Sequence, residues 1–259
     1  GNDSGDITAV EETTFLPVSG DSTGVQGITL VSIPGGTFQM GSTTGDKHEQ
    51  PVRQVTVSAF QMGRYEITQE QYQAVMGSNP SRFTGDLNRP VEMVSWYDAV
   101  KFCNNLSEAA GLQPCYNLTT WECDFTKNGF RLPTEAEWEY ACRAGTTTRL
   151  NIGNTSSELM KACWFYENSG WTTHVVGGKQ ANSFGLYDMH GNVREWCNDW
   201  DGRYRGETAN DPQGLASSSS RVIRGGSLFN YFADCLSASR SCGYPDFRNI
   251  TLGFRVVRR

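Results

Sequence analysis

Three stretches between Thr68 and Gly145 carry the signals of helices, and in the second of them the hydrophobic positions recur with helical spacing. Each stretch follows a Ser or Thr that has Gln, Asp or Glu three residues later, a pattern in which the two side chains cap the first amide groups of a helix. We therefore predict helices that begin after Thr68, Ser95 and Thr134 and end at Gly77, Gly111 and Gly145. In the second helix one face carries Trp96, Val100, Cys103 and Leu106 or Ser107.

Strand patterns flank these helices. Residues 28–41 (ITLVSIPGGTFQMG) contain two short apolar runs around a Pro-Gly-Gly turn and predict a hairpin, and QVTVSAF alternates as a half-buried strand does. After Gly145 we predict no helix, and only short strands such as VIRGG and GFRVV among loops rich in Gly, Asn, Ser and aromatic residues. Long irregular stretches inside a compact domain are usually functional or stabilised by an ion.

Composition divides the chain into two parts. Residues 1–26 are rich in Gly, Ser, Thr and Asp and predict a flexible linker, and residues 27–259 predict one domain. A net charge of −6 and a pI near 5.2 argue against nucleic-acid binding through phosphates. The sequence contains no run of eighteen apolar residues, so it predicts no membrane-spanning helix. Because the chain begins with Gly1 rather than Met, we expect that a targeting segment preceded it and was removed.

Cysteines and histidines give weak signals. Eight cysteines suggest an oxidising compartment in which some of them pair, but no CxxC motif or Cys/His spacing predicts a zinc site. His48, His174 and His190 have no metal-ligand spacing, so we expect surface or packing roles for them.

The C-terminal stretch has an unusual composition. Between Gly226 and Phe254 there is no Lys, Glu, Gln, Met or Trp, although these five types make up 44 of the 230 residues outside this window. About five or six of them would be expected there by chance. This bias points to a binding role.

Seven ordered motifs between Ile28 and Val257 carry a family resemblance. They are IPGGTFQMGS, YEITQEQY, NRPVEMVSWYDAVKFCNNLSE, GFRLPTEAEWEYACRAG, NSFGLYDMHGNVREW, RVIRGGS and LGFRVV. Together they resemble the formylglycine-generating enzyme (sulfatase-modifying factor) family. The resemblance implies an α+β, C-type-lectin-like fold of the formylglycine-generating-enzyme subtype, with much irregular loop structure.

The enzymes of that family oxidise a protein cysteine with two copper-binding cysteines at set positions after a GGS motif. The same spacing puts Asn230 at the first of these positions and Cys235 at the second. An amide cannot replace a thiolate as a Cu(I) ligand, so we expect neither copper nor catalysis. Cys242 is an alternative partner for Cys235 at a different spacing. A buried thiol or half of a disulfide is the interpretation of Cys235 that we prefer.

A non-enzymatic branch of the same fold fits the biased window. It comprises the spirochaete-type variable proteins of diversity-generating retroelements, in which randomised NNY codons cannot encode Lys, Glu, Gln, Met or Trp. This resemblance implies a variable region at residues 228–251, here called the C-terminal segment, in which Arg240, Pro245 and Arg248 belong to a fixed frame. The ligand-binding positions that it implies are Phe229, Asn230, Tyr231, Phe232, Asp234, Ser239, Ser241, Cys242, Gly243, Tyr244, Phe247, Asn249, Ile250 and Thr251.

Their chemistry fits recognition, because Tyr and Phe supply rigid contact area and Asn, Ser and Gly adapt their hydrogen bonds. Such residues sit on loops that a rigid core supports. Two alternatives remain: the rings are core residues of an inactive homologue, or the chain is a copper-dependent oxidase. Exposure of the rings distinguishes packing from binding.

GLYDMHGNVREW resembles the calcium loop of the family. The implied ligands are the side chains of Asp188 and Glu195 and the carbonyls of Gly191 and Val193, a set of oxygens that suits a structural calcium ion. Alternatively, the two carboxylates cap turns and pair with arginines such as Arg194 or Arg224.

The resemblance also implies where the protein acts. We expect export to a bacterial cell surface, as an outer-membrane lipoprotein whose lipid anchor lies upstream of Gly1 and is its only contact with a membrane. The expected partner is a macromolecule, namely a protein on another cell, rather than a nucleic acid.

Overall fold

The computed structural model describes residues 12–14 and 27–259. The helices are α1 (Gln69–Met76), α2 (Trp96–Ala109), α3 (Glu135–Arg143) and α4 (Ser156–Ala162), with short 3-10 helices η1 (Lys47–Glu49) and η2 (Phe232–Cys235). The strands are β1 (Glu12–Thr14), β2 (Thr29–Ile33), β3 (Gly36–Met40), β4 (Arg53–Val57), β5 (Phe60–Gly63), β6 (Cys163–Trp164), β7 (His190–Gly191), β8 (Arg194–Trp200), β9 (Ala209–Asn210), β10 (Arg221–Arg224), β11 (Arg240–Gly243), β12 (Leu252–Gly253) and β13 (Val257–Arg258).

The three predicted helices are confirmed, and each begins with a complete capping box. Helix α1 ends at Gly77 in the left-handed conformation, as predicted. Helix α3 ends one residue earlier than predicted, because Ala144 already adopts a positive φ of 46° before Gly145. The predicted apolar face of α2 is buried.

The prediction that no helix follows Gly145 is wrong. Helix α4 begins after Thr155, whose side chain accepts a hydrogen bond from the amide of Glu158 while Glu158 caps in return. This is the same capping box that identified the other helices. The helix has only seven residues and buries Leu159 and Ala162, so its apolar pattern is too short to stand out.

The predicted hairpin over residues 28–41 is also wrong. Its two halves are strands, but β2 lies in a sheet of order β1-β2-β5-β13, whereas β3 lies in a sheet of order β3-β4-β9. The Pro-Gly-Gly turn therefore passes the chain from one sheet to another. Part of the predicted linker is strand as well, because Glu12–Thr14 pair with Thr29–Val31. The rest of that linker lies outside the described residues.

A second four-stranded sheet, of order β11-β10-β8-β12, carries the C-terminal half. Its central strand β8 was not predicted, since its sequence REWCNDW mixes charges with apolar residues. The structure explains this mixture: five of the seven residues are buried, and Glu195 has a buried arginine partner. Strand β10 is buried along its whole length, and β11 forms the edge.

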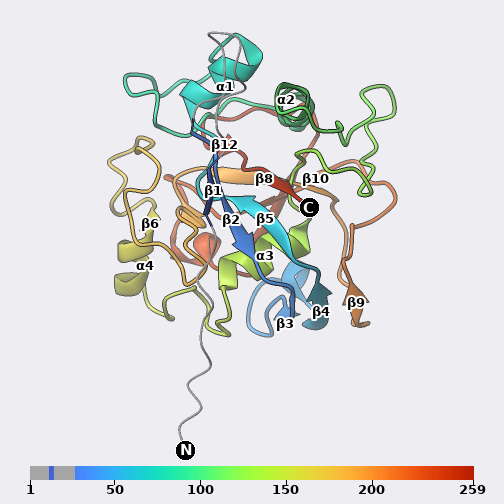
Figure 1. Cartoon of the computed structure of the whole chain (residues 1–259). Helices are drawn as coiled ribbons and strands as arrows, with labels where there is room; N and C mark the ends of the chain where they lie inside the picture. The colour runs from blue at the N-terminus through green and yellow to red at the C-terminus, as the bar shows by residue number, and fades with distance from the viewer. Residues whose placement is uncertain (1–11, 15–26) are drawn as a thin grey trace, which may run out of the picture.

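Helix α3 packs against β3, β4, β8 and β10 and so joins two sheets. In Figure 1 α1 and α2 lie at the top of the view, and α3 lies below the central strands. Separate hydrophobic clusters surround α2 and α3, and a third, smaller cluster lies under the C-terminal segment and includes Leu159, Cys163, Phe165 and Cys235.

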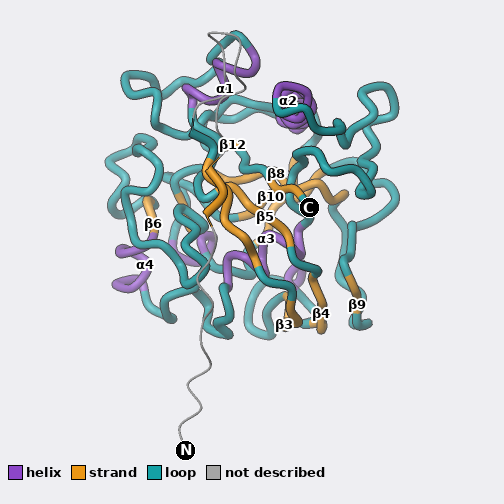
Figure 2. Tube along the Cα trace, viewed as in Figure 1, coloured by secondary structure: helices purple, strands orange, loops and turns teal. Residues whose placement is uncertain are grey.

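Most of the chain is loop, as Figure 2 shows. The predicted α+β fold with abundant irregular structure is thereby confirmed. Within the described ranges, no helix combines the length and the apolar character that crossing a bilayer requires.

Candidate functional site

The aromatic side chains of the C-terminal segment do not form a buried core. Tyr231, Tyr244 and Phe247 are exposed, at 58%, 64% and 40% of their surfaces. Phe229 and Phe232 are half-buried. Fully buried rings would have indicated packing, and these three exposed rings are what a contact surface requires.

Two aromatic residues from outside the segment extend this surface. The ring of Tyr166 lies 4.6 Å from that of Tyr231 and 5.4 Å from that of Trp171, and Trp171 meets Phe229 edge-on at 5.9 Å. Trp171 is 62% exposed. We call these four residues the aromatic cluster. Tyr166 and Trp171 were not among the predicted positions; they lie in the aromatic-rich run CWFYENSGW, which by itself does not show which surface they join.

A cavity of about 280 Å³ lies against the part of the segment between Asn230 and Ser241. We call it the segment pocket. Its lining from the segment includes Asn230, Ala233, Asp234, Leu236, Ser239, Arg240 and Ser241, and residues from elsewhere include Arg149 and Arg194. The pocket therefore combines predicted positions with charged residues that the sequence did not single out.

Arg149 also contacts the segment through an aromatic ring. Its guanidinium carbon lies 5.0 Å from the ring centroid of Phe232, within the range of a cation–π interaction. Arg194 is anchored by Thr251, whose hydroxyl accepts a hydrogen bond of 2.9 Å from it, and its Nε is buried without a partner. Burial lowers the pKa of Arg194, which the charge of Asp234 partly offsets.

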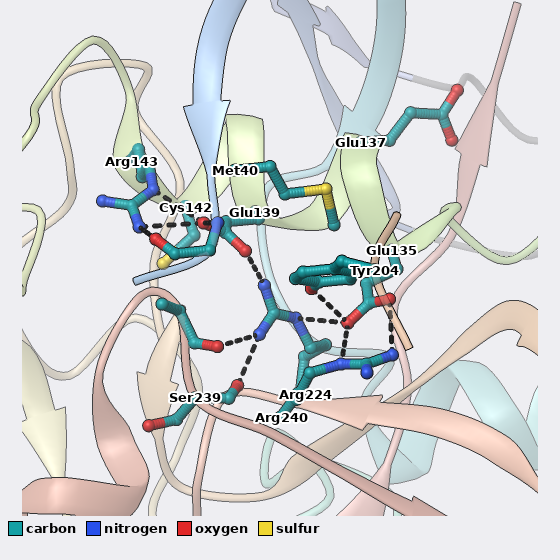
Figure 3. A network of polar contacts seen from close by, with 12 residues as sticks. Met40, Glu135, Glu137, Glu139, Cys142, Arg143, Tyr204, Arg224, Ser239 and Arg240 are labelled. Atoms are coloured by element: carbon teal, nitrogen blue, oxygen red, sulfur yellow. Dashed lines mark hydrogen bonds and ion pairs between the residues drawn. The ribbon is translucent and has the colours of Figure 1, made fainter. Parts of the chain in front are cut away.

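A buried ionic network fixes the backbone beneath this surface (Figure 3). Arg224 on β10 donates to the carbonyls of Ala238 and Ser239, at 2.7 and 2.6 Å, and pairs with Glu139 on α3. Glu139 in turn accepts from Arg143 at 2.9 Å. The segment is therefore tied to α3 through its peptide groups.

Arg240 makes a second tie to α3. Its Nε and one terminal nitrogen donate to the carboxylate of Glu135 at 2.7 and 2.9 Å, and the hydroxyl of Tyr204 donates to the same carboxylate at 3.0 Å. The charges of Arg240 and Arg224 lower the pKa of Glu135 although its burial opposes this. Arg240 was predicted to belong to a fixed frame, and these contacts give it a structural role.

The remaining frame positions also have structural partners. Arg248 pairs with Asp98 at 2.8 Å, and the carbonyl of Pro245 accepts from the amide of Trp96 at 3.0 Å. Residues 252–257 (LGFRVV) are buried throughout.

Two of the predicted ligand-binding positions point inward. Ser239 is buried, and its hydroxyl donates to the carbonyl of Ala233 at 2.6 Å. Thr251 is buried, and its hydroxyl donates to Asn249 at 2.7 Å while accepting from Arg194. The prediction of exposed side chains is wrong for these two, because local hydrogen bonds fold them back onto the backbone.

The other positions vary in exposure. Asp234, Ser241 and Cys242 are exposed, and Asn230, Gly243, Asn249 and Ile250 are half-buried. A Cβ atom on Gly243 would lie 3.1 Å from the ring of Trp196, so a larger residue there requires its neighbours to shift by a few tenths of an ångström.

The positions of the family's two cysteines hold Asn230 and Cys235, which have different surroundings. Asn230 accepts a hydrogen bond from Ser227 at 2.7 Å and donates to Asp234 at 3.2 Å. Cys235 is buried in the small hydrophobic cluster that includes Cys163. The preferred interpretation of Cys235 as a buried thiol is confirmed.

Cys242 does not serve as a substitute partner for Cys235. It is exposed on the edge strand β11, where partial burial and the neighbouring Asp201 raise the pKa of its thiol. The expectation that some cysteines pair is wrong for this structure, because all eight lie in the described part of the chain and all are free. No cluster of three or more His, Cys, Asp or Glu side chains suited to a metal ion occurs within residues 12–14 and 27–259.

The predicted calcium loop fits a cation only in part. The Oδ2 atom of Asp188 accepts from the amide of Gly177 at 2.7 Å, and its Oδ1 is buried without a partner. Both oxygens of Glu195, however, accept from Arg255 at 2.7 Å, and Oε2 also accepts from Trp138. A guanidinium thus already occupies the carboxylate that calcium would need, so the four residues do not fit as a set. The alternative, in which a carboxylate pairs with an arginine, holds for Glu195, but its partner is Arg255 rather than Arg194 or Arg224.

The histidines have the roles that we expected. His48 is exposed, and the ring of His174 stacks on Trp164 at 3.7 Å. His190 is buried, where its Nδ1 donates to the carbonyl of Cys235 at 2.7 Å and its Nε2 accepts from the amide of Asn151 at 3.2 Å. Burial lowers the pKa of His190 to about 4. This ring is another tie to the C-terminal segment.

The comparisons with known proteins agree with this geometry. Variable protein 1 of Treponema denticola superposes with a TM-score of 0.87 at 37% identity, covering 96% of this chain and 99% of that one. A protein of Paenibacillus barcinonensis described as chaperone protein LppX is 37% identical over 75% of this chain and 79% of its own length. The formylglycine-generating enzyme of Mus musculus is 29% identical over 88% of this chain and 74% of its own length. The family model described as the sulfatase-modifying factor enzyme 1-like domain matches residues 18–259, and the chain belongs to this family.

Proposed function

We propose that this protein is a noncovalent ligand-binding protein whose C-terminal segment is the diversified recognition surface. The observation that carries the proposal is the contrast within that segment. Tyr231, Tyr244 and Phe247 are exposed, while Arg224 donates to two backbone carbonyls of the segment and the side chain of Arg240 pairs with Glu135 on α3. Exposed rings on a rigid support are suited to binding because little conformational entropy is lost on contact.

The segment pocket and the aromatic cluster give this surface two kinds of contact. The cluster offers Tyr231, Phe229 and Trp171 as flat apolar area, and the pocket offers polar groups such as Asn230 and Asp234. A macromolecular partner fits this combination better than a small molecule does, since Tyr231 and Trp171 expose more than half of their surfaces. Similarity to a Treponema denticola variable protein over nearly the whole length of both chains supports the same function.

The enzymatic alternative is a copper oxidase that converts a protein cysteine to formylglycine. Asn230 occupies one of the two positions that the resemblance assigns to catalytic cysteines, and it is engaged by Ser227 and Asp234. Cys235 is fully buried and packs in an apolar cluster. We therefore propose that the protein is not an enzyme.

The proposed function also specifies where the protein is displayed and what kind of partner it binds. We propose display at a bacterial surface through a lipid anchor upstream of Gly1, with a protein on another cell as the partner. Treating intact cells with a protease that cannot enter them and detecting the chain by immunoblot tests display. Loss of the chain from intact cells supports it, and full protection contradicts it.

Sequencing the coding region in many cells of one population tests diversification. Substitutions should gather in residues 228–251 and spare Arg240, Pro245 and Arg248. A uniform distribution of substitutions over residues 27–259, or none at all, would contradict a diversified segment.

Binding is tested by probing an array of purified bacterial and host surface proteins with the chain. A spot bound by the wild type should be lost when Tyr231 and Tyr244 are both replaced by Ala, and kept when Leu118, an exposed apolar residue outside the C-terminal segment, becomes Ala. Formylglycine formation from a cysteine peptide in the presence of copper would favour the oxidase instead.

A further inference from the structure

A second pocket, outside the C-terminal segment, lies beside the end of strand β8. It has a volume of about 310 Å³ and is lined by residues of β4, the start of α3 and the loop between β8 and β9. We call it the arginine pocket because Arg53, Arg203, Arg205 and Arg240 all line it. Arg240 is the one lining residue that it shares with the segment pocket.

Among the residues that the structure describes, three of these arginines lack a carboxylate partner. Arg240 is satisfied by Glu135 and by Asp201. In the described part of the chain Arg53, Arg203 and Arg205 form no ion pair, because none of the salt bridges there involves them. Unpaired guanidinium groups that line one cavity attract an anion.

Arg53 is the least satisfied of the three. Its Nε is buried without a hydrogen-bond partner, and one terminal nitrogen meets only the thioether sulfur of Met40, at 3.7 Å. The guanidinium carbon lies 4.9 Å from the ring centroid of Tyr204. A half-buried cation that has ring and sulfur contacts but no oxygen acceptor within residues 12–14 and 27–259 is prepared for an external one.

The loop that carries Arg203 and Arg205 is anchored by Tyr204, which lies between them in the sequence. Tyr204 is buried and donates its hydroxyl proton to Glu135 at 3.0 Å. Its neighbours on both sides are exposed and line the pocket. The two cations are thus attached to a fixed point rather than to a free loop.

The acidic residues of the pocket do not cancel this charge. Glu135 is already used by Arg240 and Arg224, and Glu207 is the exposed carboxylate of the lining. Asp199 accepts from the amide of Glu135, and burial together with the charge of Glu135 raises its pKa to about 7. Three cations without ion pairs in the described ranges therefore face less than two negative charges, in a chain whose net charge is −6.

We infer that the arginine pocket binds a small phosphate-bearing ligand, with Arg53, Arg203 and Arg205 as the groups that contact the phosphate. A guanidinium presents a planar fork of donors that matches the oxygens of phosphate two at a time. Trp200 and Leu215 also line the pocket and provide apolar area for the organic part of such a ligand. This site does not depend on the proposed function of the C-terminal segment.

Inorganic phosphate is the probe, titrated into the purified chain by calorimetry and followed by thermal unfolding, with chloride at matched ionic strength as the reference. Phosphate should bind saturably and raise the melting temperature above that in chloride. Arg53→Gln should weaken phosphate binding about tenfold or more, as loss of one charge-assisted contact does.

Two further variants keep the test decisive if Arg53→Gln folds poorly. The double variant R203Q/R205Q changes only exposed side chains and should lose phosphate binding with its unfolding curve in chloride unchanged. Arg82→Gln removes an exposed arginine that does not line this pocket and should bind phosphate as the wild type does. Equal effects of phosphate and chloride, or an equal loss in R82Q, would overturn the inference.

Discussion

The buried ionic network between α3 and β10 and the exposed side chains of the C-terminal segment differ in burial and in polarity. In the network Arg224, Glu139 and Arg143 are buried and each makes charged hydrogen bonds. On the surface Tyr231 and Tyr244 expose more than half of their area. The difference separates the residues that stabilise this short region from the exposed residues to which the proposed function assigns ligand binding. Substitutions should therefore have large effects on folding in the network and small ones on the surface.

The largest effect is expected for Arg224→Met. It removes one of the two arginine partners of the buried Glu139 carboxylate and two hydrogen bonds to segment carbonyls, so the free energy of unfolding should fall by roughly 3–5 kcal/mol. Urea denaturation followed by tryptophan fluorescence measures this. Arg248→Met, which breaks the exposed pair with Asp98, is the matched control and should cost less than about 1 kcal/mol. Equal losses in the two variants would contradict a division between network and surface.

A smaller effect is expected from protonation of His190, which joins the network side to the 3-10 helix of the segment. Its pKa lies near 4 in the folded protein because burial favours the neutral ring, whereas its ordinary value is 6.5. The unfolded state therefore binds more protons between these values, and stability falls as the pH drops from about 6.5 to 4, by about 3 kcal/mol for this group. At higher pH the group has no effect.

The variant His190→Gln isolates this contribution. The raised pKa values of Asp188 (about 6) and Asp199 (about 7) act in the opposite direction, because these carboxyls take up protons in the folded state first. Denaturation midpoints of wild type and variant are measured from pH 7 to pH 4. Because Asp188 and Asp199 contribute equally to both proteins, the difference between the two midpoints reports on His190 alone. Parallel curves for the two proteins would show that His190 does not titrate as its surroundings indicate.

Gly226→Ala should have an intermediate effect at the boundary between the two regions. Gly226 has a φ of +69°, and a Cβ atom there would lie 2.5 Å from the sulfur of Cys235 and 2.9 Å from the carbonyl oxygen of Asp234. Strain and collision together should cost about 2 kcal/mol in unfolding free energy.

Gly111→Ala supplies the comparison for this substitution. Gly111 has the same φ of +69°, but a Cβ atom there would meet nothing within 4 Å, so only the backbone strain applies. The difference between the two variants measures how tightly the 3-10 helix packs on the GGS turn. Identical losses would mean that the helix moves aside freely.

The smallest effect is expected on the surface itself. Tyr231→Ala and Tyr244→Ala should each change the free energy of unfolding by no more than about 0.5 kcal/mol, because more than half of each residue is exposed, and Phe247→Ala, at 40% exposure, should cost about 1 kcal/mol. Thermal unfolding of the three variants measures this. A loss above about 2 kcal/mol would place the ring in the core and favour the interpretation as an inactive homologue.

Local rules predicted the local parts of the fold. The capping boxes at Thr68, Ser95 and Thr134 located three helices, because such a cap is decided by residues three positions apart. The sheet partners of β2 and β3 depend on distant strands, so the same reasoning gave a hairpin that does not exist. Strand β8 was not predicted because its buried Glu195 breaks the apolar pattern. The residue that neutralises this charge is Arg255, sixty residues away in the sequence.

The sequence identified which segment forms the candidate site but not which of its side chains point toward solvent. The window that lacks five residue types identified the segment, and three of its rings are exposed. Composition contains no information on which side chain turns inward, so Ser239 and Thr251 were placed wrongly. Tyr166 and Trp171 could not be assigned to the surface, since only the folded chain brings them beside Tyr231 and Phe229.

The bonds from Arg224 to the segment end on the carbonyl oxygens of Ala238 and Ser239. His190 likewise donates to the carbonyl of Cys235. Every amino acid has this oxygen, so these anchors do not distinguish one residue type from another. Many side chains along the segment can therefore be substituted while the same hydrogen bonds from Arg224 and His190 continue to hold its backbone.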